Sequence, residues 1–69
     1  MTQKELSYIE DAISHEGNII KIINLALSNL EDEELVSFMN QELTIHESMK
    51  EKLLNHLEVE SNEWSLIYG

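Results

Sequence analysis

Two short segments of this 69-residue chain carry the side chains best suited to chemistry, and the segments are alike. Each has an acidic residue, a histidine four positions later and then a glutamate: Asp11-x3-His15-Glu16 and Glu42-x3-His46-Glu47. Residues four apart share one face of a helix, so Glu42 and His46 point the same way. Carboxylates and imidazoles at this spacing can bind a divalent metal ion or form a hydrogen-bonded polar pair.

The elements that must position these residues are two long helices. In the first, predicted over about residues 3–29, apolar residues recur at alternating steps of three and four, which is the heptad spacing of a helix packed on a partner. Its stripe consists of Leu6, Ile9, Ile13, Glu16, Ile20, Ile23, Leu27 and Leu30, and Ala12, Ile19 and Ala26 widen it on one side.

The second helix is predicted over about residues 33–58. Its apolar stripe contains Leu35, Phe38 with Met39, Glu42, Ile45 with His46, Met49, Leu53, and His56 with Leu57. Ser28 and Asn29 are residues that commonly end a helix, and Asp32 is a good N-cap for the next one. A short break between two long helices predicts antiparallel neighbours, and therefore an all-α helical hairpin over residues 1–60.

The last segment, residues 61–69, differs in composition because it holds Trp64, Leu66, Ile67 and Tyr68. We interpret it as an apolar C-terminal tail and predict that it docks on the helices, because so much apolar surface is rarely left in water. The alternatives are a frayed terminus and a docking peptide for another protein.

The hairpin should bring three polar residues together. With the turn centred near residue 31, Glu16, Glu42 and His46 fall within about a turn and a half of one another. Buried carboxylates need partners. We predict a buried polar pair of Glu16 and His46 that fixes the register of the helices, with a divalent metal ion bound by all three residues as the alternative. His15 and Glu47 point off the stripe and should be solvated.

One hairpin cannot bury all the apolar surface of the first helix. Ile19, Ile22, Ile23 and Leu25 occupy too much of its circumference for a single partner helix to cover. A chain of 69 residues has a marginal core, and without cysteine it has no disulfide to reinforce that core. We therefore predict a homodimer or a higher homo-oligomer, with two hairpins forming a four-helix bundle.

The composition argues against several functions. The net charge is −10, from 14 acidic and 4 basic residues, so we expect no binding to nucleic acid or to an anionic membrane surface. No segment has the pattern of a signal peptide, and the apolar stretch 19–30 is too short and too polar to span a bilayer. The chain has no cysteine nucleophile, no glycine-rich phosphate loop and no arginine, so we expect no enzymatic activity and no required cofactor.

Three stretches of the chain carry a family resemblance: MTQKELSYIEDAISHE at the start, LEDEELVSFM at the break and IHESMKEKLLNHL in the second helix. They resemble the small proteins related to spore coat protein F of endospore-forming bacteria over residues 3–57. The resemblance implies a ferritin-like half-bundle made of one helical hairpin, and a structural, self-assembling or coat-associated role. The segment 17–20 and the residues after Val59 depart from the family's pattern.

Taken together, the sequence predicts a non-enzymatic protein with a structural or protein–protein interaction role. Its expected location is the cytoplasm or, following the resemblance, the spore coat. Two other functions stay open. One is a ferritin-like bundle that binds a divalent metal or iron, and the other is a small adaptor that docks a partner through its apolar helix or its tail.

Overall fold

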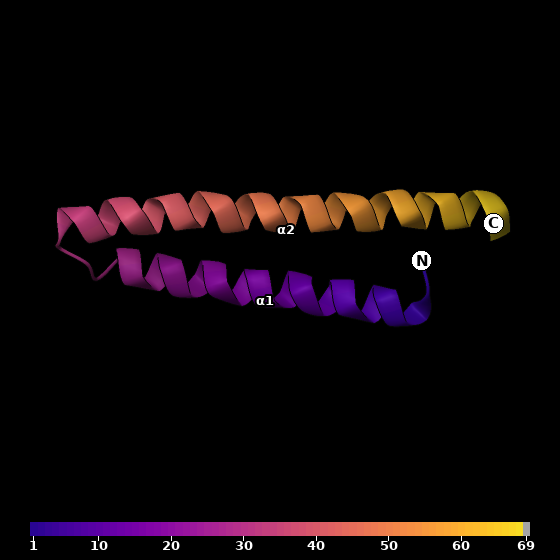
Figure 1. Ribbon diagram of the computed structural model, residues 1–69, viewed down its shortest axis with the longest axis horizontal. Helices are drawn as coiled ribbons and strands as arrows, with labels where there is room; N and C mark the ends of the chain where they lie inside the picture. The colour runs from indigo at the N-terminus through magenta and orange to yellow at the C-terminus, as the bar shows by residue number, and fades with distance from the viewer. Residues whose placement is uncertain (69) are drawn as a thin grey trace.

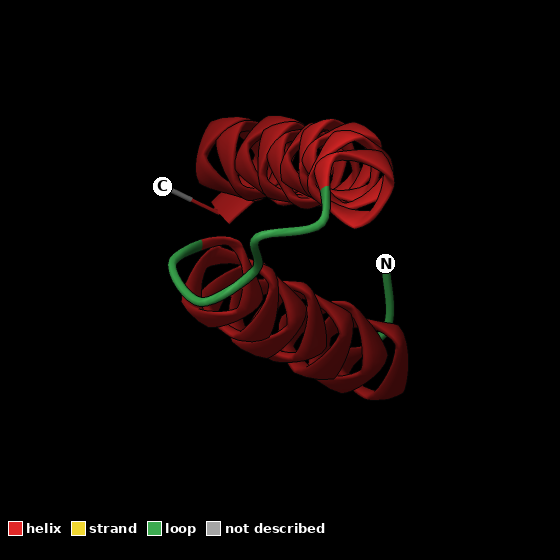
Figure 2. Cartoon of the chain, turned by 90° about the vertical axis from the view of Figure 1, so that its left-hand side faces the viewer, coloured by secondary structure: helices red, strands yellow, loops and turns green. Residues whose placement is uncertain are grey.

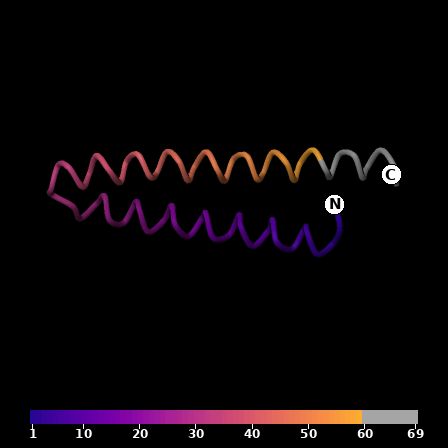
Figure 3. The backbone as a smooth tube through the Cα atoms, in the orientation of Figure 1, coloured from indigo at the N-terminus to yellow at the C-terminus, as the bar shows by residue number. Residues whose placement is uncertain are grey.

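The chain folds as an antiparallel hairpin of two helices (Figure 1). In the computed structural model, which describes the backbone of residues 1–68 and the side chains of residues 1–59, α1 spans Gln3–Leu27 and α2 spans Glu33–Tyr68. The helices lie side by side (Figure 2) and run in opposite directions (Figure 3). The molecule is a narrow rod with principal extents of 53 × 16 × 13 Å. The prediction of an all-α helical hairpin is confirmed.

The first helix begins with a capping box formed by Thr2 and Glu5. The Thr2 hydroxyl accepts a hydrogen bond from the Glu5 backbone N–H at 3.0 Å, and the Glu5 carboxylate accepts one from the Thr2 backbone N–H at 2.9 Å. These bonds satisfy backbone donors that the start of the helix leaves without partners. Hydrogen bonding to Thr2, first to its backbone and then to its side chain, lowers the pKa of the Glu5 carboxyl.

Hydrogen bonds at both helix ends close the turn between them. The Ser28 hydroxyl and the Asn29 side-chain amide both donate to the carbonyl oxygen of Leu25, at 2.7 and 2.8 Å. Asp32 then caps α2, because its carboxylate accepts a hydrogen bond from the Leu35 backbone N–H at 3.0 Å. The predicted roles of Ser28 and Asn29 at the end of the first helix, and of Asp32 before the second, are confirmed.

The second helix is longer than the sequence analysis predicts. Its expected end lies near Glu58, but its backbone stays helical to Tyr68. The reason is that neither proline nor glycine occurs between these positions, so nothing in the chain breaks the helix there. Residues 61–68 therefore continue α2 and do not form a tail separate from it. The predicted docking of Trp64 lies outside the described side chains.

One stripe of each helix forms the contact between them, and we name it the inner seam. Its members have heptad spacing and are buried or half-buried: Leu6, Ile9, Ile13, Glu16, Ile20, Ile23 and Leu27 from α1, and Val36, Met39, Leu43, His46, Lys50, Leu53 and Leu57 from α2. Among the described side chains, Ile23 is the only hydrophobic one that is buried, at 4% exposed. The hairpin alone therefore has a thin core.

Candidate functional site

A cluster of three polar side chains lies near the middle of α1 and the facing part of α2. The Nδ1 atom of His46 is 2.5 Å from Oε2 of Glu16 on the other helix, and its Nε2 atom is 3.6 Å from Oε2 of Glu42, one turn earlier on α2. The Glu16 side chain is 11% exposed, that of His46 21% and that of Glu42 35%. The predicted proximity of these residues and the predicted burial of Glu16 are confirmed.

His46 supplies the hydrogen-bond partner that the buried Glu16 requires. An unpaired carboxylate in this position would be costly, and the Nδ1 atom of the imidazole can donate to it. The two residues belong to different helices, so their contact exists in one alignment of α1 against α2. The predicted polar pair of Glu16 and His46 is therefore present, and its role in fixing the register stays a prediction.

The three side chains do not surround a common point. Glu16 lies against Nδ1 on one edge of the imidazole ring, whereas Glu42 faces Nε2 on the other. An ion at Nε2 would have His46 and Glu42 as ligands, and Glu16 would only orient the ring. Two ligands are fewer than a structural zinc site uses, and among residues 1–59 no group of three or more histidine, cysteine or acidic side chains is placed to hold an ion. This geometry does not fit one ion bound by all three residues of a single hairpin. Metal binding stays a prediction.

The two similar sequence motifs are not equivalent in space. In the first, Glu16 is buried and His15 is exposed, whereas in the second His46 is half-buried and Glu47 is exposed. The expected solvation of His15 and Glu47 is confirmed. Each motif contributes a different group, a carboxylate from α1 and an imidazole from α2, to a single contact.

A second apolar stripe on each helix lies beside the inner seam and is not covered by the hairpin. Its members directly precede inner-seam residues in the sequence, and we name this surface the outer face: Tyr8, Ala12, His15, Ile19, Ile22 and Ala26 from α1, and Leu35, Phe38, Glu42, Ile45 and Met49 from α2. Its large apolar side chains are mostly exposed, with Ile22 at 64% and Phe38 at 54%. The hairpin therefore presents apolar groups to water along much of its length.

Both stripes of the outer face lie on one side of the hairpin. Successive residues are rotated by about 100° around a helix axis, so each outer stripe is displaced from its inner stripe by the same angle and in the same sense. For antiparallel helices that face each other across the inner seam, this shared displacement turns both outer stripes toward the same side. The outer face is therefore continuous across α1 and α2.

Three of the four residues predicted at a dimer interface are available to a partner. Ile22 and Leu25 are exposed and Ile19 is half-buried, with Leu25 at the edge of the outer face. Ile23 differs from these three, because it follows Ile22 by one residue and is rotated inward, so that α2 already covers it in the inner seam. The dimer interface itself stays a prediction.

The single apolar stripe predicted for the second helix consists of two stripes. Met39 and His46 belong to the inner seam, whereas Phe38 and Ile45, the residues before them, lie on the outer face. The contribution of α2 to the outer face is missing from the sequence prediction for this reason. The outer face of α2 could have been predicted from its repeated pairs of adjacent apolar residues. In each pair, one residue can face the inner seam and the other the outer face.

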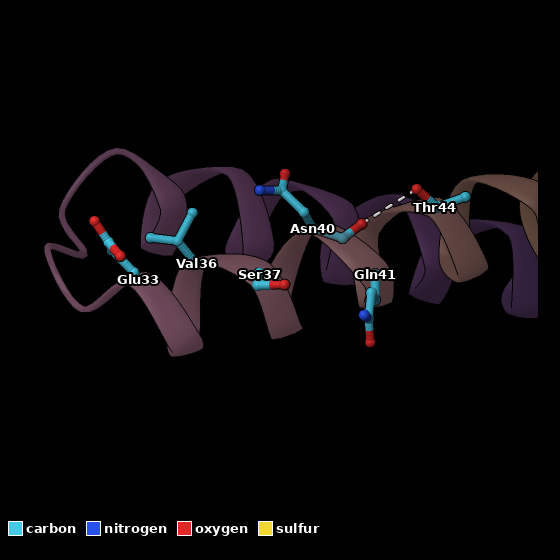
Figure 4. Close-up of a pocket in the computed structure, with 6 residues that line it drawn as sticks. All are labelled: Glu33, Val36, Ser37, Asn40, Gln41 and Thr44. Atoms are coloured by element: carbon cyan, nitrogen blue, oxygen red, sulfur yellow. Dashed lines mark hydrogen bonds between the residues drawn. The ribbon is translucent and has the colours of Figure 1, made fainter.

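A shallow groove runs along the first turns of α2 (Figure 4). It is lined by Glu33, Val36, Ser37, Asn40, Gln41 and Thr44, all from this helix, and within it the Thr44 hydroxyl donates to the Asn40 carbonyl oxygen at 3.2 Å. Ligand sites are usually concave and enclose most of their ligand. A groove with walls from one helix does not enclose a substrate.

Long helices raise the question of membrane insertion, because about 20 residues of helix can cross a bilayer. Within the described residues, neither α1 nor α2 is long and apolar enough to do so. The outer face is instead one apolar side of the helix pair, and single apolar side chains such as Leu54 and Val59 are exposed elsewhere on it.

Comparison with known proteins leaves the family of this chain open, because no protein-family model, no curated protein and no solved structure matches it. The resemblance to the spore coat protein F family stays a prediction based on short motifs.

Proposed function

We propose that this chain is a non-enzymatic assembly protein whose hairpins pair through the outer face, giving a homodimer with a structural or protein–protein interaction role. The observation that carries the proposal is the row of exposed apolar side chains along one side of the hairpin, with Ile22 and Phe38 more than half exposed. Monomeric proteins rarely leave an apolar surface of this extent in water. A second outer face is a suitable cover, since a two-fold interface joins a surface to its own copy.

The accessible surface of the hairpin supports this pairing. The chain exposes 5528 Å², whereas a compact monomer of 8.0 kDa should expose about 4,450 Å². Its radius of gyration is 16.0 Å, compared with about 11 Å for a compact domain of this length. The single hairpin therefore has the dimensions of a part of a larger particle.

Two hairpins together remove this excess surface. A compact particle of twice the mass should expose about 7,400 Å², which is about 3,700 Å² less than two separate hairpins expose. Permanent homodimers bury roughly 2,000–5,000 Å². The area fits a dimer whose folding and association occur together, as expected from the thin core of one hairpin.

The distribution of charge permits such a contact. The chain carries a net charge of −10, yet Glu42 is the only acidic residue of the outer face. The other carboxylates lie on the remaining surfaces, where physiological salt screens repulsion beyond about 8 Å. Self-association of this acidic protein therefore places one carboxylate per chain in the contact.

In the adaptor alternative, a helix of another protein packs on the outer face instead of a second copy of this chain. An adaptor of that kind would be monomeric when purified alone, so the oligomeric state separates the two functions. Self-assembly is also what the resemblance to the spore coat protein F family implies. The arrangement of Glu16, Glu42 and His46 gives no specific support to a metal-carrier function.

Sedimentation equilibrium at micromolar concentration tests the proposal. The wild-type chain should have twice its monomer mass of 8.0 kDa. Ile22→Glu adds a carboxylate to the middle of the outer face and should dissociate and unfold the protein together. Asn24→Glu is the matched control, because it adds the same charge at an exposed position of α1 outside the outer face, and it should stay dimeric. A stable, cooperatively folded wild-type monomer would overturn the proposal.

A further inference from the structure

The row of outer-face residues on α2 continues beyond Met49 with the same heptad spacing. Its next members are Lys52, His56 and Val59, and all three are exposed. We name the whole row the long stripe, and it consists of Leu35, Phe38, Glu42, Ile45, Met49, Lys52, His56 and Val59. Its one acidic residue, Glu42, and its one lysine, Lys52, lie at equal distances of about 7.5 Å from its middle at residue 47, in opposite directions.

The long stripe is complementary to a reversed copy of itself. When two long stripes lie antiparallel with their middles at one level, residues whose numbers add up to 94 meet. Glu42 of each stripe then meets Lys52 of the other, which pairs opposite charges. The remaining pairs are Ile45 with Met49, Leu35 with Val59, and Phe38 with His56. The stripe thus matches apolar with apolar side chains on both sides of each charge pair.

The outer-face stripe of α1 has its middle at the same level of the rod. Within one hairpin, Glu16 contacts His46, and Gly17 lies beside Lys50, whose Nζ atom is 3.6 Å from the place of a Cβ at Gly17. Residues of α1 and α2 whose numbers add up to about 64 therefore lie at one level, so residue 47 is level with Gly17. Two antiparallel α1 stripes centred there match each alanine with a large side chain. Their pairs are Ala12 with Ile22, Ala26 with Tyr8, and His15 with Ile19.

Two copies can pair face to face in two ways that keep neighbouring helices antiparallel. If the two-fold axis runs along the rod, equal levels meet and α1 of each copy faces α2 of the other. If the axis crosses the rod, levels on opposite sides of the axis meet, and each helix faces its own counterpart. We name these the equal-level and the crossed arrangement. Only the crossed arrangement places one long stripe against the other.

The carboxylate of Glu42 distinguishes these arrangements. Its side chain is 35% exposed in the hairpin, and its 3.6 Å separation from Nε2 of His46 is too long for a hydrogen bond. In the equal-level arrangement it faces Ile22 of the other copy, so the second copy covers a carboxylate without supplying a donor. In the crossed arrangement it faces Lys52 when the axis passes at the level of residue 47, whereas an axis at the level of Ile45 would set it against Met49.

Given the self-pairing proposed above, we infer that the second copy docks in the crossed arrangement, with the axis at the level of residue 47 and each Glu42 in an ion pair with Lys52 of the other copy. Both side chains are accessible, since Lys52 is exposed and Glu42 is half-buried. The dimer then has two identical ion pairs on either side of an apolar centre made by Ile45 and Met49. A shift of one copy along the other would separate both ion pairs, so they fix the alignment of the hairpins.

A charge exchange between two chains tests the ion pair. Glu42→Lys chains alone would set lysine against lysine, and Lys52→Glu chains alone would set glutamate against glutamate, so each should raise the dimer Kd at least about tenfold. A heterodimer of the two variants has one reversed and one original ion pair. In an equal mixture, its share should rise from the statistical half to about four-fifths or more, as measured by native mass spectrometry.

The matched control replaces Glu42→Lys with Glu47→Lys, which has the same net charge but lies at an exposed position outside the long stripe. Its mixture with Lys52→Glu chains should contain about one half heterodimer, because no reversed ion pair forms. A share near one half for the Glu42→Lys mixture as well would overturn the ion pair. In the equal-level arrangement that result is expected, since Glu42 and Lys52 of the two copies would be about 15 Å apart along the rod.

Disulfide trapping provides a second measurement, because the chain has no cysteine of its own. Leu35→Cys chains mixed with Val59→Cys chains should form a mixed disulfide dimer under a mild oxidant. In the equal-level arrangement these positions are about 36 Å apart along the rod, far beyond the roughly 7 Å between Cα atoms that a disulfide can bridge. Ile19→Cys chains mixed with Ile45→Cys chains would be linked there instead, and should not be linked in the crossed arrangement.

The oligomeric state separates a failure of this inference from a failure of the proposed function. Any other disulfide pattern in chains that sediment as dimers overturns the crossed arrangement and leaves self-assembly standing. A monomeric wild-type chain overturns self-assembly and the arrangement together.

Discussion

Ile22 and Ile23 are adjacent and chemically identical, yet the first is 64% exposed and the second 4%. The rotation of about 100° between successive helix residues places Ile23 in the inner seam and Ile22 on the outer face. The inner seam is closed by the chain itself, whereas the outer face is left uncovered. The apolar residues of α1 are therefore divided between two surfaces, and the hairpin covers only one of them.

Truncation in the inner seam should have the largest effect on stability. Ile23→Ala removes the most buried apolar side chain and should lower the free energy of unfolding by about 3 kcal/mol. Urea unfolding followed by circular dichroism measures this change. Asn24→Ala, at the exposed neighbouring position, should change the free energy by less than about 0.5 kcal/mol. Equal effects of the two substitutions would contradict the assignment of Ile23 to the core.

The same truncation at Ile22 tests whether the outer face is covered in solution. On an isolated hairpin, Ile22→Ala should cost less than about 0.5 kcal/mol, because the side chain is largely exposed. Beneath a second copy the loss should approach about 2 kcal/mol, and the melting temperature should rise with protein concentration. Thermal melts at two concentrations provide the measurement. A small loss that is independent of concentration would argue against pairing through this face.

The hydrogen-bonded pair of Glu16 and His46 should respond differently to the loss of each residue. His46→Leu leaves Glu16 buried without its donor and should cost about 2 kcal/mol. Glu16→Leu removes the carboxylate itself and should stay within about 1 kcal/mol of the wild type, or exceed it. Urea unfolding of both variants compares them. A chelator should leave the wild-type melting temperature unchanged if the cluster is only a polar pair, and a decrease would favour the metal alternative.

Gly17 lowers the stability of α1 at a position beside the inner seam where a larger residue would fit. Glycine in a helix costs backbone entropy, so Gly17→Ala should stabilise the protein by about 0.5–1 kcal/mol. The added Cβ would meet the flexible end of Lys50 at 3.6 Å, which is an ordinary van der Waals contact. Thermal melts measure the gain. If Gly17→Ala is destabilised, the two helices lie too close together at this point to accommodate the added Cβ.

The smallest effect concerns the capping box, which lies outside both apolar surfaces. The pKa of Glu5 is lowered in the fold from its usual 4.5. The stabilisation by its carboxylate is therefore present above pH 4.5 and is lost as the pH falls through the lowered, folded-state value. Glu5→Ala should reduce the urea midpoint slightly at pH 7 and by less at pH 3. Glu10→Ala, at an exposed position outside the capping box, serves as the control for general charge effects.

Much of the fold follows from local patterns in the sequence. The heptad spacing of α1 predicts which residues face α2, and Ser28, Asn29 and Asp32 mark the turn because their side chains satisfy backbone groups at helix ends. The meeting of Glu16 with His46 follows from the equal rise of two antiparallel helices. The capping box could have been found too, from the spacing of Thr2 and Glu5.

Other features depend on contacts that a sequence pattern does not specify. The end of α2 is obscured because the composition changes after residue 60 while no helix breaker occurs there. The division of apolar residues between two surfaces is also hidden, because Phe38 and Met39 are equally apolar and only their rotation separates them. The sequence likewise predicts that Glu16, Glu42 and His46 are neighbours, but not that the two carboxylates face opposite edges of the ring.

Because the inner and outer stripes differ by a single residue step, α1 has an alternative packing against α2. Turning α1 by about 100° around its axis would bring Ile22 in place of Ile23, and His15 in place of Glu16. Both packings would bury isoleucines, but the turned helix would place Ala12 and Ala26 where Ile13 and Leu27 now pack, so hydrophobic burial favours the observed rotation. The hydrogen bond between Glu16 and His46 favours the same rotation, since the turned helix would remove the carboxylate that accepts from His46. Apolar volume and one polar contact therefore agree on a single packing of α1 against α2.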